Sequence, residues 1–106
     1  MVDRLTLLHD LKNYLQQGYR DSIHDIILFG SQAKGTSDVN SDYDILIVLD
    51  NDYTSRDENL LYDLCYDIDL KYNIIIDAHL ISTRELGTLK GKQPMISTAL
   101  KTGIYA

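Results

Sequence analysis

Two short motifs separated by ten residues are the part of this sequence best suited to chemistry. Gly30 and Ser31 follow one apolar run, and Asp42 and Asp44 stand at the entrance to another. Side chains along a strand alternate between its faces, so the two carboxylates are expected to project from one face. Carboxylates this close repel unless a cation lies between them, and their hard oxygen atoms favour Mg²⁺. The turn at Gly30 and Ser31 offers N–H groups and a hydroxyl to a phosphate. The pattern therefore predicts a site for metal and phosphate.

A third carboxylate, Asp77, interrupts the apolar run at residues 74–81. Alternation along a strand places Asp77 on the same face as Ile75 and His79. A charge in an apolar strand is costly unless it is paired or bound to a metal. The alternative is an edge strand on which Asp77 is simply solvated. His79 either contacts substrate or is an ordinary satisfied or exposed histidine.

Together these residues resemble the active-site signature of the DNA polymerase β-like nucleotidyltransferase superfamily. That signature is Gly-Ser, ten residues and Asp-x-Asp, matched here by Gly30, Ser31, Asp42 and Asp44. Within the superfamily, the chain is most similar to the minimal nucleotidyltransferases (MNT proteins) over nearly its whole length. The resemblance implies Asp77 as the third catalytic residue and all three aspartates as metal ligands. It also implies two Mg²⁺ ions, about 3.5–4 Å apart in such sites, and in-line attack on the α-phosphorus of ATP.

The same resemblance assigns nucleotide binding to the glycine turn. Gly30 N–H and the Ser31 hydroxyl would hold the β- and γ-phosphates, and Lys34 is the nearest cation in the sequence. A solvated Lys34 is the alternative interpretation. Many members of the family have arginine where Gln32 and Lys34 stand, so the Gln32 departure is expected to weaken nucleotide contacts.

Composition limits the partners that this chain can take. The 106 residues are expected to form one domain, residues 1–106, with no appended substrate domain. The formal net charge of −6 and the dispersed lysines and arginines argue against nucleic acid as a partner.

The apolar runs are of strand length and the first residues lack a leader pattern, so we expect no membrane segment and a cytoplasmic location. The single cysteine, Cys65, is expected to be buried on a helix.

Periodicity predicts an α/β (α+β) fold, a small mixed sheet with helices packed on it, and the resemblance implies that this sheet has the polymerase β-like nucleotidyltransferase arrangement. Ser55 and Glu58 are expected to form the capping box of the longest helix. The expected elements are a helix ending near Gly18, a strand at 23–29, a short helix at 31–35, a loop at 35–41, a strand at 45–49, a helix ending at Asn73, a strand at 74–81, a helical turn at 83–89, and a helix from Pro94 to Gly103.

Three functions remain open at this point. The resemblance to MNT antitoxins implies transfer of AMP from ATP to a tyrosine of a separately encoded HEPN-type toxin. A second possibility is a small-molecule acceptor, as in aminoglycoside nucleotidyltransferases, which carry an additional drug-binding domain. A third is a non-catalytic MNT module that neutralises its partner by contact. Because degenerate members lose carboxylates and this chain has the full set, catalysis is favoured.

Overall fold

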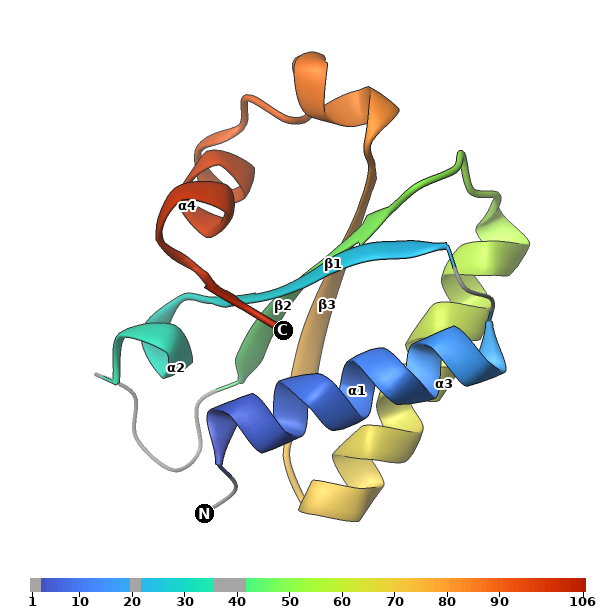
Figure 1. The fold of residues 1–106 in the computed structure, drawn as a ribbon, viewed down its shortest axis with the longest axis vertical. Helices are drawn as coiled ribbons and strands as arrows, with labels where there is room; N and C mark the ends of the chain where they lie inside the picture. The colour runs from blue at the N-terminus through green and yellow to red at the C-terminus, as the bar shows by residue number, and fades with distance from the viewer. Residues whose placement is uncertain (1–2, 20–21, 36–41) are drawn as a thin grey trace.

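The computed structural model describes residues 3–19, 22–35 and 42–106 (Figure 1). The expected order of elements is confirmed, with a short additional strand, β4, at the carboxyl end. The elements are α1 (Arg4–Gly18), β1 (Ile23–Phe29), α2 (Ser31–Lys34), β2 (Tyr43–Leu49), α3 (Ser55–Tyr72), β3 (Ile76–Ser82), the 3₁₀ helix η1 (Arg84–Gly87), α4 (Pro94–Thr102) and β4 (Ile104–Tyr105).

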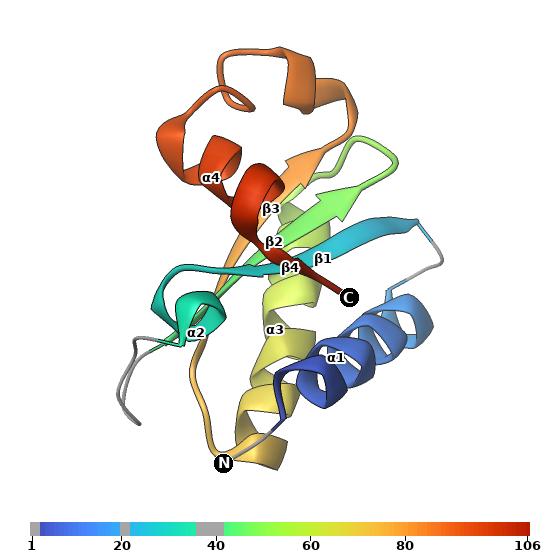
Figure 2. The same cartoon turned by 60° about the vertical axis from the view of Figure 1, so that its left-hand side comes forward.

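The strands form one mixed sheet in the order β3-β2-β1-β4. β1 is antiparallel to both β2 and β4, whereas β2 and β3 are parallel. Helices α1 and α3 lie on one face of the sheet and α4 lies on the other (Figures 1 and 2). The mixed sheet covered by helices confirms the expected fold class.

Two apolar clusters hold these layers together. On one face, buried leucines of α1 pack with α3 and the strands; they are Leu7, Leu8, Leu11 and Leu15. On the other face, Ile96 and Ala99 of α4 pack against Phe29, Leu46 and Val48. The central strand β2 contributes to both clusters, which explains its continuous apolar sequence.

The N-terminal cap of α3 differs from the expected capping box at Ser55 and Glu58. The cap is one residue earlier, at Thr54 and Asp57. The Asp57 N–H donates to the Thr54 hydroxyl at 3.2 Å, and the Thr54 N–H donates to the Asp57 carboxylate at 2.9 Å. Thr-x-x-Asp therefore satisfies both N–H groups, and the prediction was displaced by one residue because several neighbouring polar residues at this helix start can take the same capping roles.

Two strands also begin at different residues from those expected. β2 begins at Tyr43 rather than Ile45, and β3 begins at Ile76 rather than Ile74. The two strands start together because Tyr43 pairs with Ile76 in the ladder. Most of the expected polar loop, residues 36–41, lies outside the described residues.

One polar contact joins the two helices on the same face. The Asp10 carboxylate of α1 accepts hydrogen bonds from Lys71 Nζ and the Tyr72 hydroxyl of α3, both at 2.6 Å. These two donors hold the pKa of Asp10 below its usual value.

Across the described residues, no helix combines the length and apolar character that a membrane span requires.

Candidate active site

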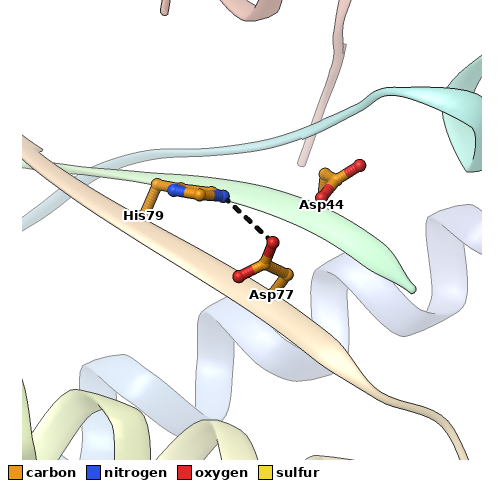
Figure 3. A group of neighbouring side chains, drawn as sticks. All are labelled: Asp44, Asp77 and His79. Atoms are coloured by element: carbon orange, nitrogen blue, oxygen red, sulfur yellow. Dashed lines mark ion pairs between the residues drawn. The ribbon is translucent and has the colours of Figure 1, made fainter. Parts of the chain in front are cut away.

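Asp44 of β2 and Asp77 of β3 are directly opposite each other in the parallel ladder. Residues at one register position project from the same face of a sheet, so both carboxylates lie on the face covered by α4. Figure 3 shows the two side chains gathered beside His79. The sheet thus brings together two residues that are far apart in the sequence.

His79 completes a group of three side chains. Its Nε2 atom lies 3.5 Å from Asp77 Oδ2, and its ring packs against Phe29 with the centroids 5.7 Å apart. One ligand atom from each of Asp44, Asp77 and His79 lies within 4.8 Å of the other two. The alternation along β3 predicted that His79 shares the face of Asp77, but it did not reveal this contact with the carboxylates.

The charge of Asp44 is poorly compensated in this group. Partial burial, and then the neighbouring Asp77 carboxylate, raise the pKa of Asp44, while His79 acts in the opposite direction. A divalent cation between the two carboxylates would remove this repulsion. Carboxylate oxygens are the ligands that Mg²⁺ prefers, so the donor set present fits the expected metal.

Asp42 stands at the margin of this group. It is an exposed residue immediately before β2, and its carboxylate is not part of the group formed by Asp44, Asp77 and His79. Its charge nevertheless contributes to the raised pKa of Asp44, so the two residues are neighbours.

The position of β3 bears on the alternative considered for Asp77. β3 is the outermost strand at one side of the described sheet, and the Asp77 side chain is 54% exposed. The alternative interpretation expected β3 to be an edge strand, and the structure confirms that part of it. Asp77 is not an isolated solvated charge, however, because it lies beside both Asp44 and His79.

The glycine turn lies against the Asp44 carboxylate. Gly30 precedes α2 with a φ of +76°, a backbone conformation that residues other than glycine adopt rarely. A β carbon built at Gly30 would lie 2.4 Å from Asp44 Oδ2. The absence of a side chain at this position is therefore what allows the turn and the carboxylate to approach each other.

The short helix after the turn is held in place by α1. Arg4 donates hydrogen bonds from one guanidinium nitrogen to the carbonyls of Gln32 and Ala33, at 3.1 and 2.9 Å. No local pattern in the sequence predicts this contact, because Arg4 is distant in the chain. Ser31 begins α2, and Lys34 ends it with an exposed side chain that makes no hydrogen bond or ion pair within the described part of the chain.

The fold is shared with solved nucleotidyltransferase structures of the polymerase β-like fold. Spectinomycin adenyltransferase from Enterococcus faecalis, solved with ATP and spectinomycin, matches with a TM-score of 0.62 and 21% identity. That match covers 80% of this chain and 36% of the neighbour, so the chain spans about a third of that enzyme. A toxin–antitoxin structure with AMP-PNP matches with a TM-score of 0.62 and 20% identity, covering 92% of this chain and 69% of that chain. The toxin–antitoxin MntA–HpeT mutant matches with a TM-score of 0.62 and 16% identity, with the same coverage.

Sequence comparison defines the family. The model of the nucleotidyltransferase domain matches residues 8–105, so the chain belongs to this family and is a nucleotidyltransferase enzyme. "Putative protein adenylyltransferase MJ0604" of Methanocaldococcus jannaschii is 40% identical over 79 residues, which are 74% of this chain and 73% of that protein. MJ1305 of the same organism, which carries the same description, is 34% identical over 100 residues, 90% of this chain and 67% of that protein. The resemblance drawn from the sequence is confirmed.

Proposed function

We propose that this enzyme is a Mg²⁺-dependent adenylyltransferase that moves AMP from ATP to a hydroxyl of a partner protein, as the MNT antitoxin of a HEPN/MNT pair. The observation that carries the proposal is the pair formed by Asp44 and Asp77 beside the Gly30 turn. The description of the relatives as protein adenylyltransferases supports a protein acceptor. The toxin–antitoxin neighbours support a separately encoded partner.

In this proposal the three aspartates, Asp42, Asp44 and Asp77, hold Mg²⁺. Bound Mg²⁺ would polarise the phosphoryl oxygens and lower the pKa of the acceptor hydroxyl. The acceptor oxygen forms a bond to the α-phosphorus of ATP, and the bond from that phosphorus to the oxygen bridging to the β-phosphorus breaks. Pyrophosphate departs, and the Asp77 carboxylate accepts the hydroxyl proton.

The residues of the turn would bind the rest of the triphosphate. Gly30 N–H and the Ser31 hydroxyl hold the β- and γ-phosphates, and Lys34 extends toward them from the end of α2. Arg4 fixes α2 through its carbonyl groups and so positions this turn. Gln32 supplies no positive charge to this turn, which is expected to reduce affinity for ATP.

Mass spectrometry of a co-expressed HEPN-type partner tests the proposal. The wild-type enzyme should add one AMP to the partner, and Asp77→Asn should abolish the addition without preventing the two proteins from binding. Asp63→Asn is a matched control, because Asp63 is an exposed carboxylate on α3, outside the group formed by Asp44, Asp77 and His79. A partner that is silenced but unmodified by the wild type would contradict catalysis and favour a module that acts by contact.

A small-molecule acceptor is the second candidate, favoured by the structural likeness to spectinomycin adenyltransferase. The two functions are separated by incubating the enzyme with Mg²⁺, ATP and spectinomycin in the absence of any protein acceptor. Release of pyrophosphate that depends on spectinomycin would contradict the protein-directed proposal.

A further inference from the structure

β3 has one edge that is not paired with another described strand, and its backbone groups alternate between that edge and β2. The Ile75 carbonyl accepts from Tyr43 N–H of β2, and the Thr83 N–H donates to the Leu49 carbonyl of β2, each at 2.8 Å. In a parallel pair, alternate residues direct both backbone groups toward the same neighbour. The odd-numbered residues of β3 therefore bond to β2, and the even-numbered ones direct their N–H and C=O groups outward.

Side chains occupy the outward N–H groups at both ends of this edge. The Ile76 N–H donates to Asp69 Oδ1 of α3 at 3.0 Å. At the other end, the Ser82 N–H donates to Glu85 Oε1, also at 3.0 Å. Such covering is how proteins protect a free edge from unwanted pairing. Here the protection leaves the middle of the strand open.

The open part is centred on Ala78. The Tyr53 hydroxyl donates to the Leu80 carbonyl at 3.2 Å and so occupies that group. Between Ile76 and Leu80, the outward groups that remain are the Ile76 carbonyl, both backbone groups of Ala78 and the Leu80 N–H, and no hydrogen bond joins them to another residue that the structure describes. Both groups of Ala78 can thus pair with one residue of an added strand.

A pocket of about 260 Å³ lies along this open edge. Its floor includes Ala78 and Leu80, and its walls come from Tyr62 of α3 and Met95 of α4, which cover opposite faces of the sheet. The volume is below the 300–1,000 Å³ typical of small-molecule sites. The lining residues from β3 are consecutive, Ala78, His79 and Leu80, so the pocket lies alongside the middle of this strand.

We propose that an extended segment of the acceptor protein adds to the free edge of β3 and presents the hydroxyl to be modified. This inference rests on the proposed function. The residue opposite Ala78 would accept and donate the two free backbone hydrogen bonds. The adjacent residue, opposite Asp77, would then project from the face that carries Asp44 and Asp77. Side chains opposite each other on neighbouring strands have β carbons roughly 5 Å apart, within reach of an acceptor hydroxyl.

Charge favours a different protein over a second copy of this chain as the occupant. Each copy carries a net charge of −6, and pairing two β3 edges would bring the exposed Asp77 carboxylates toward each other. Glu58 and Lys90 also line the pocket. Lys90 lies 3.5 Å from the Glu85 carboxylate, whereas no ion pair joins Glu58 to another residue in the described ranges. A segment bearing lysine or arginine near the modified residue would compensate this charge.

Binding of synthetic peptides tests the inference directly. The probes are peptides of about ten residues with alternating β-branched residues, one tyrosine and flanking lysines. With a peptide that binds, amide hydrogen exchange should slow at Ala78 and Leu80. Methylating the peptide backbone nitrogen that pairs with Ala78 should weaken binding up to about tenfold, while methylation one residue away should be tolerated. The Glu58→Gln variant should bind the lysine peptides several-fold more weakly, unlike the control Asp63→Asn.

The outcomes separate this inference from the proposed function. Binding that leaves exchange at Ala78 and Leu80 unchanged would overturn the docking site, as would a panel in which no peptide binds. Protection of the same two amides in the protein alone at high concentration would identify a second copy as the occupant instead. Protection by a peptide that receives no AMP upholds the docking site and contradicts the acceptor chemistry. AMP transfer to a peptide that leaves both amides unprotected upholds the acceptor chemistry and contradicts the docking site.

Discussion

Gly30 and Asp44 are in such close contact that a single β carbon on Gly30 would lie 2.4 Å from Asp44 Oδ2. The glycine has a φ of +76° and directly follows the strand β1, while the aspartate lies on the neighbouring strand β2. The proposed phosphate-binding turn and the proposed metal ligand therefore form one unit, in which a change at either residue alters the other.

The first prediction concerns this contact. Gly30→Ala should destabilise the protein by more than the roughly 1–2 kcal/mol cost of an ordinary left-handed residue, because a φ of +76° with a ψ of −156° is essentially restricted to glycine and the new methyl group also displaces the Asp44 carboxylate. Gly35→Ala is a comparison variant, since Gly35 is in the ordinary left-handed region with a φ of +72° and a ψ of 16°, and a β carbon placed there would meet no atom of the described residues within 4 Å. In an Asp44→Ala background, the cost of Gly30→Ala should fall but stay above that of Gly35→Ala, because the backbone strain at Gly30 remains. Denaturant unfolding of the four combinations measures the coupling, and simple additivity would contradict the contact.

The second prediction concerns the stability cost of Asp44. Its pKa is raised in the folded protein, so the folded state binds more protons than the unfolded state above the ordinary value of 3.8. Stability should therefore fall as the pH rises through the raised pKa. At pH 7 with EDTA, Asp44→Asn should stabilise the protein by a few tenths of a kcal/mol, roughly 1–4 °C in Tm, because the partly exposed group is screened by solvent.

That gain should disappear below about pH 3.8, where the carboxyl is protonated in both states. Thermal unfolding at the two pH values provides the measurement. A variant that is less stable than the wild type at pH 7 in EDTA would show that Asp44 is not a repelled charge.

The third prediction concerns ligand binding. Mg²⁺ with AMP-PNP should raise the Tm of the wild type, because a ligand that binds only the folded state stabilises it by about 2.7 kcal/mol at one hundred times its dissociation constant. The double variant Asp42→Asn with Asp44→Asn should remain folded and lose this shift. A shift that survives would place the metal at other residues. Ser31→Ala should reduce the shift while leaving the Tm without ligand unchanged.

The fourth prediction concerns the contact between α1 and α3. The pKa of Asp10 is lowered by Lys71 and Tyr72, so its contribution is present above the unfolded value of 3.8 and is lost as the pH falls through the lower folded value. Asp10→Asn should cost about 1 kcal/mol at pH 7 and less near pH 2. Tyr72→Phe should cost about half as much at pH 7. Equal costs for Asp10→Asn at both pH values would contradict the assignment.

Local patterns were sufficient to predict most of the fold. Leucine periodicity marked α1, the glycine after an apolar run marked the turn, and Pro94 marked the start of α4. β4 was missed because its two residues are too few to show an alternation. Capping was misplaced by one residue because several polar residues at the start of α3 satisfy the same pattern.

The site was predictable only in part. Alternation along one strand placed Asp77 and His79 on a common face, but it could not show that Asp77 stands opposite Asp44. Register depends on the pairing of strands that are distant in the sequence. The same limit applies to Arg4, which supports α2 from another helix, and to the open edge of β3, whose existence depends on which strand lies outermost.

The alignment of Asp44 with Asp77 has a consequence for how the chain selects its sheet pairing during folding. A slip of β3 by one residue would turn Asp77 toward the opposite face, among the apolar side chains that α1 and α3 cover. Burying that carboxylate without a partner would cost more than the repulsion tolerated in the native pairing. Asp44 and Asp77 thus lower the stability of the native sheet, but the slipped pairing of β3 is disfavoured even more. The same two residues therefore help to specify the sheet in which they act.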